Sequence, residues 1–310
     1  MGRLAACWVA LCSVGAGALF TNGLQHHRRG GKCAGCIGVL QWNFHAECFN
    51  RCTKSTGKHC DPNYPACQGN ATAFFSDLLK GSMGDLDFAG VEQLNDEAFQ
   101  AGSEWGNVSN VCGGTNGFGV YPFDIATIFY RRSRWTASGG PNSTGRQGGC
   151  MERVKGASEG NYRAFVVQAF ERKTDGLRVV VVAAHDPHIG EYKEEIVPLA
   201  NAVQATQERT GVKRLILVAD TNWEHPYIPL MGKSSHSIME DIYPGVGHIA
   251  STDLHRTCCA YTYVHTYDRI IAAGFPHHSV AFNTTLPFAN AVPPWVALNM
   301  HSPVMGTLSF

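Results

Sequence analysis

The sequence predicts an α/β fold in which strands far outnumber helices. Its 310 residues, 44% hydrophobic and 16% charged, suit one large domain or two small ones. Several apolar, β-branched runs have the length of buried strands, among them residues 177–184 and 214–220. Residues 191–209 form the best amphipathic helix pattern, with Pro198 suited to the start of the helix proper.

Strands are expected wherever an apolar run is bounded by turn residues, and they are predicted at 39–45, 87–93, 123–131, 163–170, 177–184, 214–220, 267–274 and 301–310. Residues 163–170 and 177–184 should form a hairpin through a turn at 173–176. Residues 138–149 and 223–257 are rich in turn-forming residue types, so we expect loops there.

Residues 1–22 have the features of a secretory signal: an early arginine, an apolar stretch and small residues near a plausible cleavage point. The apolar stretch is too short for a confident membrane span, so we expect a secreted monomer with no span after signal removal. A cysteine-containing basic segment follows at 23–38, and the main domain should occupy 39–310 with a cysteine-rich insertion at about 45–70. Glycosylation sequons that agree with secretion lie at Asn70, Asn107, Asn142 and Asn283.

Cysteine usage also indicates an oxidising compartment. Of the 12 cysteines, two lie in the signal, and six of the remaining ten lie within residues 33–67. We expect disulfides whose connectivity the sequence leaves open. The alternative is a zinc site built from Cys33 and Cys36 with Cys48, Cys52 or His59. The formal net charge is zero, so any binding of nucleic acid must come from a local patch or a metal rather than from bulk charge.

Polar side chains end two of the most apolar strands. The run at 214–219 leads into Asp220 and Asn222, which alternation along an extended chain would place on one face. The run at 177–184 ends in His185. Together these residues indicate a hydrolytic centre at one rim of a sheet. Taken singly, Asp220 can simply open a turn, and His185 can be a hydrogen-bonded interior histidine.

Three more carboxylates lie within or at the entrances of strands: Glu92, Asp124 and Asp268. A buried carboxylate is costly unless it is paired, protonated or bound to a metal. Metal coordination is the simplest explanation for Glu92, which lies inside an apolar strand.

The order of these residues resembles that of the endonuclease/exonuclease/phosphatase superfamily, and within it most closely the secreted deoxyribonuclease I family. The resemblance spans residues 39–310 and is carried by Trp42-Asn43, Glu92, residues 128–131, His185, Asp220 with Asn222, Tyr267-Asp268-Arg269-Ile270 and residues 301–304. It implies a four-layer sandwich of two packed mixed β-sheets flanked by helices, a divalent metal at the rim, and phosphodiester hydrolysis.

The resemblance also implies roles. His185 and His301 would be the paired general acid and base, because attacking water must lose a proton while the leaving oxygen gains one. Asp124 would orient His185, and Asp268 would orient His301.

The remaining roles concern the metal and the phosphate. Glu92 with Asn43 would hold Mg²⁺ or Ca²⁺, which are hard cations suited to oxygen ligands. Asp220 and Asn222 would orient the water or the phosphate, and Arg163 would clamp a phosphate oxygen.

The sequence departs from the family pattern at several positions. Met300 stands where a carboxylate near the metal is expected, so the site should lose metal affinity or recruit another donor. The order Glu92-Gln93 is reversed, so in the usual register Gln93 would take the ligand position and Glu92 would face away. His278 is an alternative to His301 as the terminal histidine, and Asn95 replaces an arginine that relatives direct at the minor groove.

The expected function is therefore that of a secreted, metal-dependent phosphodiesterase, with nucleic acid as substrate and DNA favoured over RNA. One alternative is a sphingomyelinase or phosphoinositide phosphatase-like hydrolase, because the fold serves both substrate classes. The other is a degenerate, non-catalytic binding protein, which the substitutions at Met300 and Gln93 would explain.

Overall fold

The computed structural model describes the chain from Gly35 onward, with gaps. The described residues are 35–44, 67–81, 85–94, 101–113, 123–138, 146–152, 162–187, 192–222, 234–252, 257, 266–276, 281–285, 301 and 303–310. The pattern of residue contacts divides the chain into two compact units, Met1–Gly35 and Cys36–Phe310. The fold described below is that of the second unit. The expected signal, most of the segment 23–38, most of the cysteine-rich insertion, Asn95, His278 and Met300 lie outside the described residues.

The first sheet has six described strands and contains both parallel and antiparallel pairs. Its order is β12 (Ala281–Thr285), β13 (Val304–Ser309), β1 (Ile37–Asn43), β2 (Phe88–Glu92), β4 (Phe123–Arg131) and β3 (Trp105–Gly113). β1 runs parallel to β2, and the register places Asn43 beside Glu92. The two polar side chains therefore lie beside each other at the same end of these strands.

The second sheet has seven described strands. Its order is β10 (Ile249–Ser251), β11 (Asp268–Ala273), β9 (Leu215–Asp220), β8 (Arg178–His185), β7 (Tyr162–Arg172) and β5 (Trp135–Ala137), and β6 (Arg146–Glu152) also pairs with β7. β8 runs parallel to β9 with His185 beside Asp220, while antiparallel β11 places Asp268 on the other side of Asp220. Three functional candidates thus meet at one end of three neighbouring strands.

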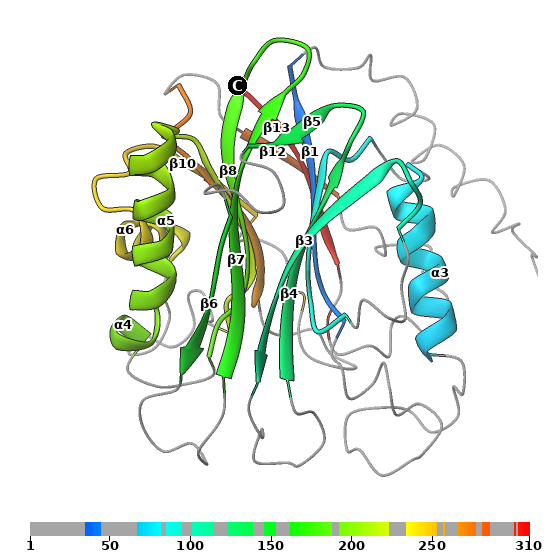
Figure 1. Ribbon diagram of the computed structural model, residues 1–310, viewed down its shortest axis with the longest axis horizontal. Helices are drawn as coiled ribbons and strands as arrows, with labels where there is room; N and C mark the ends of the chain where they lie inside the picture. The colour runs from blue at the N-terminus through cyan, green and yellow to red at the C-terminus, as the bar shows by residue number, and fades with distance from the viewer. Residues whose placement is uncertain are drawn as a thin grey trace, which may run out of the picture. The chain divides into compact units, whose positions relative to one another are not determined.

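The two sheets pack face to face around one apolar core, and helices cover their outer faces (Figure 1). Alternating residues of β8 divide between layers: Val179, Val181 and Ala183 lie between the sheets, whereas Val180 and Val182 pack under helices. The helices are α3 (Cys67–Leu79) beside the first sheet, and α4 (Tyr192–Glu195), α5 (Val197–Thr210) and α6 (Ser235–Ile242) beside the second. The predicted four-layer sandwich of two mixed sheets flanked by helices is confirmed.

Several predicted boundaries were wrong. The expected loop at 138–149 ends in a strand, because β6 begins at Arg146 and its glycines pair with β7. The expected loop at 223–257 contains α6, which the Ser234 side chain caps, and β10. The helix expected at 191–209 is two helices that part at Ile196, and Pro198 lies in the first turn of α5, where its missing N–H costs nothing.

A disulfide joins the two sheets. Cys112 of β3 and Cys150 of β6 are bonded across 38 positions of sequence. Cys36 is disulfide-bonded as well, so it is not available to the alternative zinc site. Within the described part of the chain, no helix is both long and apolar enough to span a membrane.

Gly90 allows the sheets to approach closely just below the rim. A Cβ atom at this position would lie 2.6 Å from the side chain of Val218, closer than such atoms can come. Glu92 follows Gly90 by two residues, and Asp220 follows Val218 by two. Both carboxylates therefore point, like Gly90 and Val218, into the space between the two sheets. The close approach explains how carboxylates from separate sheets come to share one site.

Candidate active site

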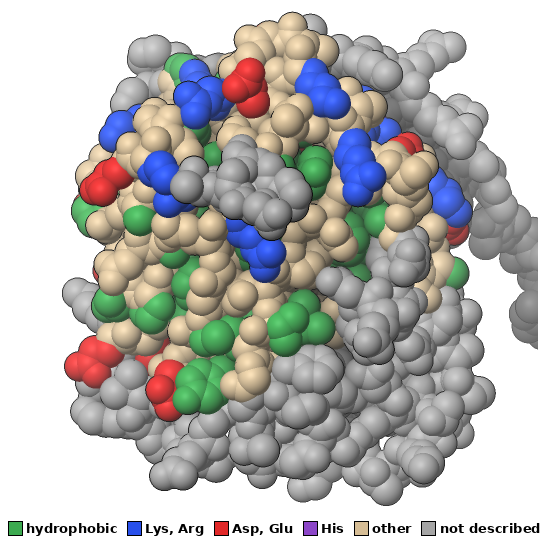
Figure 2. All heavy atoms as spheres, viewed as in Figure 1, with side chains coloured by type: hydrophobic (Ala, Val, Ile, Leu, Met, Phe, Trp, Pro, Cys, Tyr) green, Lys and Arg blue, Asp and Glu red, His purple; other side chains and the backbone are tan. Residues whose placement is uncertain are grey.

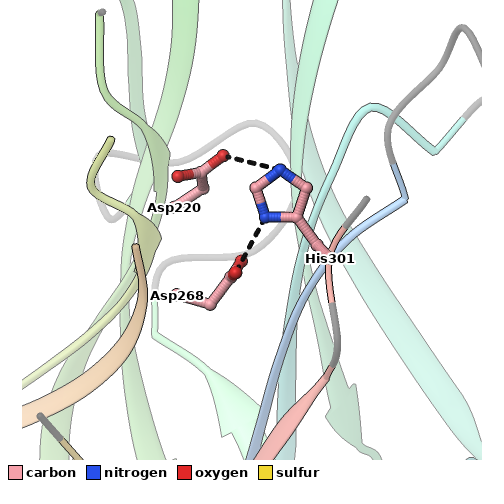
Figure 3. A group of neighbouring side chains, drawn as sticks. All are labelled: Asp220, Asp268 and His301. Carbon is pink, nitrogen blue, oxygen red and sulfur yellow. Dashed lines mark hydrogen bonds and ion pairs between the residues drawn. The ribbon is translucent and has the colours of Figure 1, made fainter. Parts of the chain in front are cut away.

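His301 lies between two carboxylates. Its Nδ1 is 2.8 Å from Asp268 Oδ2, and its Nε2 is 3.7 Å from Asp220 Oδ2 (Figure 3). The indole N–H of Trp42 donates to the backbone oxygen of His301 at 3.2 Å, which fixes the residue just before β13. Because Asp268 accepts the Nδ1 proton, Nε2 is the nitrogen that faces Asp220.

His185 has the same arrangement on the other side of Asp220. Its Nδ1 is 3.0 Å from Asp124 Oδ1, and its Nε2 is 3.5 Å from Asp220 Oδ2. The second oxygen of Asp124 accepts the Ala164 backbone N–H at 2.7 Å. Although burial alone would raise the pKa of Asp124, the charges of His185 and Arg163 and these hydrogen bonds hold it below the usual range.

Both imidazoles therefore converge on one oxygen atom, Asp220 Oδ2. Asn43 donates to the same atom through its side-chain nitrogen at 2.7 Å. Asp220 is 1% exposed, so it meets these three groups in a region shielded from water. Arg163 lies at the edge of the group, with Nη1 3.7 Å from Asp124 Oδ1.

The sequence suggested that strand alternation places Asn222, but a turn does so instead. β9 ends at Asp220, and Asn222 has a left-handed backbone with φ of 48°. Asp220 Oδ1 accepts the Asn222 backbone N–H at 3.0 Å, and the Asn222 side chain donates to the Asp186 backbone oxygen at 2.7 Å. Asp220 thus opens a turn and also faces the histidines, although the sequence analysis treated these two roles as alternatives.

Glu92 faces the site, so the reversed Glu92-Gln93 order does not turn it away as the usual register would have done. Its Oε2 accepts a hydrogen bond from the Gln41 side chain at 2.7 Å, and it is fully buried. Gln93 follows the strand with a left-handed φ of 60°, which removes it from the alternation of β2. The reversed order is accommodated because β2 ends at Glu92 and the chain turns immediately after it.

A divalent cation fits the chemistry of this donor set. The oxygen Oε1 of Glu92 is buried and has no hydrogen-bond partner among the described residues. Burial raises the pKa of Glu92 well above its usual value, and the charges of Asp220, Asp268 and Asp124 raise it further, against the Gln41 hydrogen bond. Asp220, Asp268 and His301 also offer ligand atoms within 4.8 Å of one another. Such an excess of buried negative charge calls for a proton or a cation.

Two polar residues at the site were missed by the sequence analysis. Gln41 lies two residues before Asn43 on the same face of β1, and this spacing within an apolar strand was the signal. Asp186 follows His185, and both of its carboxylate oxygens are buried without a partner among the described residues. Burial raises the pKa of Asp186 well above its usual value.

The stability of the metal-free protein should fall as the pH rises from about 6.5 to about 9. Burial lowers the pKa of His301, but the Asp268 and Asp220 charges outweigh burial and raise it to about 9, against 6.5 for a free imidazole. The folded protein therefore retains a proton that the unfolded chain loses, and the stabilisation is complete below 6.5 and gone above 9. The difference corresponds to on the order of 3 kcal/mol. Denaturant titrations in a chelator at several pH values measure it, and H301Q should flatten the slope. A stability that rises over this interval contradicts the assignment.

Comparison with family models and with curated proteins finds no match for this chain, whereas its fold has many counterparts among solved structures. No family model matches, and no curated protein sequence matches. Among solved structures, an endonuclease/exonuclease/phosphatase from Bacteroides vulgatus aligns with a TM-score of 0.57 and 14% identity over 89% of this chain and 99% of that chain. The mannosyl-6-phosphatase Bt3783 of Bacteroides thetaiotaomicron aligns with a TM-score of 0.56 and 17% identity, over 88% of this chain and 100% of that chain.

A third structure is that of D. rerio TDP2 complexed with a single-strand DNA product. It aligns with a TM-score of 0.50 and 12% identity over 89% of this chain and 100% of that chain. At these identities the likeness establishes the deoxyribonuclease I-like fold, and the functional argument depends on the side chains of this chain.

Proposed function

We propose that this protein is a metal-dependent phosphodiesterase that hydrolyses nucleic acid, with DNA as the favoured substrate. The observation that carries the proposal is the convergence of two imidazoles on Asp220 Oδ2, at 3.5 and 3.7 Å, each backed by its own carboxylate. A hydrogen-bonded structural histidine needs one partner. Two histidines arranged symmetrically about one buried carboxylate suit a reaction in which one proton is taken and another is given.

The geometry supports a division of labour between the histidines. The carboxylates Asp268 and Asp124 each accept an Nδ1 proton, so both rings turn Nε2 toward the reaction space. The raised pKa of His301, about 9, keeps this ring protonated at neutral pH, which suits donation of a proton to the leaving oxygen. His185 would then accept the proton of the attacking water. Arg163 and Asn222 would hold the phosphate oxygens.

Glu92 and Asn43 would hold the divalent cation, Mg²⁺ or Ca²⁺. When bound, such an ion neutralises negative charge that develops on the phosphate oxygens. The buried Oε1 of Glu92, which has no hydrogen-bond partner among the described residues, supports this assignment.

Substrate class depends on surface features away from these residues. On the face drawn in Figure 2, Lys and Arg side chains lie over the upper half, separated by other residues that include a few Asp and Glu. The zero net charge favours the alternative of a lipid phosphodiester or phosphoinositide. The Tyr267-Asp268-Arg269-Ile270 stretch and the single-strand DNA product in the D. rerio TDP2 structure favour nucleic acid. The tightly held pair of general acid and base suits both substrate classes and speaks against a non-catalytic role.

One experiment separates these possibilities. The purified protein with Mg²⁺ or Ca²⁺ is offered supercoiled plasmid, single-stranded RNA, sphingomyelin and a phosphoinositide, each with and without EDTA. We expect nicking of the plasmid that EDTA abolishes. Release of choline phosphate or of inorganic phosphate alone would assign the lipid alternative, and loss of all activities would leave a binding protein.

Replacing Glu92 should weaken the metal site. E92Q keeps the size and the contact with Gln41 but removes the negative charge, so we expect Mg²⁺ affinity to fall by about 10- to 100-fold or more. Isothermal titration calorimetry with Mg²⁺ measures the affinity directly. E171Q, at an exposed acid of β7, is the matched control. Equal Mg²⁺ affinity in E92Q and the wild-type protein would remove Glu92 from the metal site.

We also propose that the protein is secreted and monomeric. The disulfide between Cys112 and Cys150 supports an oxidising compartment. Mass spectrometry of the protein recovered from a secreting culture tests both cleavage after residue 22 and glycosylation of the exposed Asn107.

A further inference from the structure

Gln41 lies between Glu92 of the first sheet and Asp268 of the second sheet in the candidate site. It lies in β1, is fully buried, and extends from the first sheet toward the second. Its side-chain nitrogen donates to Glu92 Oε2 at 2.7 Å and to Asp268 Oδ1 at 3.2 Å. Glu92 belongs to the neighbouring strand of the same sheet, whereas Asp268 begins β11 of the other sheet.

The contact joins two groups with different tasks. Under the proposed function, Glu92 holds the cation, while Asp268 orients His301 through the 2.8 Å bond to Nδ1. A single NH₂ group carries two hydrogens in fixed directions, so it can satisfy one oxygen of each carboxylate at the same time. It does so without adding charge. Lysine or arginine here would compete with the cation for Glu92, and a carboxylate would add to the repulsion.

The cost of leaving these carboxylates without the amide would be high. Both are completely buried, and an unsatisfied buried acceptor is unfavourable, more so when charged. The Gln41 hydrogen bond favours the ionised form of Glu92 against burial and the charges of Asp220, Asp268 and Asp124. The other end of the amide, Oε1, has no hydrogen-bond partner among the described residues, so the role of this side chain is that of a donor.

We propose that Gln41 is a positioning residue that couples the metal-binding carboxylate Glu92 to the Asp268–His301 pair across the two sheets. The inference rests on the proposed function and deepens it. It predicts that one uncharged substitution impairs metal binding and proton transfer together. A residue that only fills space between the sheets would affect neither property in the folded protein.

The test uses Q41M, which keeps the length of the side chain and removes both hydrogen bonds. Gln168 provides the matched control, because it is also a buried glutamine whose nitrogen makes two hydrogen bonds, to the backbone oxygens of Ser138 and Ala169. Mg²⁺ binding is measured by calorimetry without substrate, and kcat and KM are measured at saturating Mg²⁺. For Q41M we expect Mg²⁺ affinity and kcat each to fall by about 10- to 100-fold with little change in KM. For Q168M we expect a lower melting temperature, with Mg²⁺ affinity and kcat within about twofold.

Each result decides the matter. Wild-type Mg²⁺ affinity and kcat in folded Q41M would overturn the inference, as would equal losses in Q168M. If Q41M does not fold, Q41N takes its place, because it keeps a buried amide but is one bond too short to reach both carboxylates. A wild-type protein that hydrolyses no phosphoester would refute the proposed function, while the calorimetric comparison would still test the link between Gln41 and Glu92.

Discussion

Replacing either imidazole by alanine should lower kcat by about 10²- to 10⁴-fold while the protein remains folded. H185A removes one partner each of Asp124 and Asp220, and H301A removes one partner each of Asp268 and Asp220. Because the proposed acid and base would act in the same step, the double variant should lose little more than the worse of the two single variants. Plasmid nicking under identical Mg²⁺ concentrations measures the three rates.

The control for these variants is H236A. His236 is exposed on α6, which covers the outer face of the second sheet, so its loss should leave the rate unchanged. Equal nicking by H185A, H301A and wild-type preparations would indicate a contaminating nuclease or a different site. A large loss in only one of the two would assign a one-histidine mechanism and refute the pairing.

The strands and the order of the site residues followed from the sequence because local signals were strong. Residues 179–184 and 215–219 are continuous apolar runs, and such runs form buried strands with polar ends whichever partners they take. Parallel pairing of β8 and β9 then brings His185 beside Asp220. The general location of the site at one rim was therefore predictable.

Other features depended on contacts between distant segments, which no local pattern contains. The sequence left open whether Glu92 or Gln93 faces the site, because this depends on the register of β1 with β2 and on where β2 ends. β6 was missed because Gly148 and Gly149 favour a loop in isolation, and only pairing with β7 makes them a strand. Gln41 was overlooked because its partners, Glu92 and Asp268, are 51 and 227 positions away.

Neutralising Asp220 should be as damaging as removing a histidine, although it removes no proton carrier. D220N keeps the shape of the side chain, and its oxygen can still accept the Asn222 backbone N–H, so the turn after β9 should persist. The lost charge, however, is the one that both Nε2 atoms face. We expect kcat to fall by about 10³-fold, within the range for disruption of acid–base catalysis.

The same substitution should lower the pKa of His301 from about 9, because the Asp220 charge is one of the causes that raise it, while Asp268 remains in place. NMR titration of the His301 ring in the metal-free protein measures this shift. D175N, at an exposed acid of the β7–β8 turn, should change neither the rate nor the titration. If D220N lowered the rate without moving the His301 pKa, Asp220 would act on the phosphate or the metal alone. If it lowered the pKa but spared the rate, the protonated state of His301 would not matter for turnover. A carboxylate shared by the two histidines requires that D220N lower both the rate and the pKa of His301.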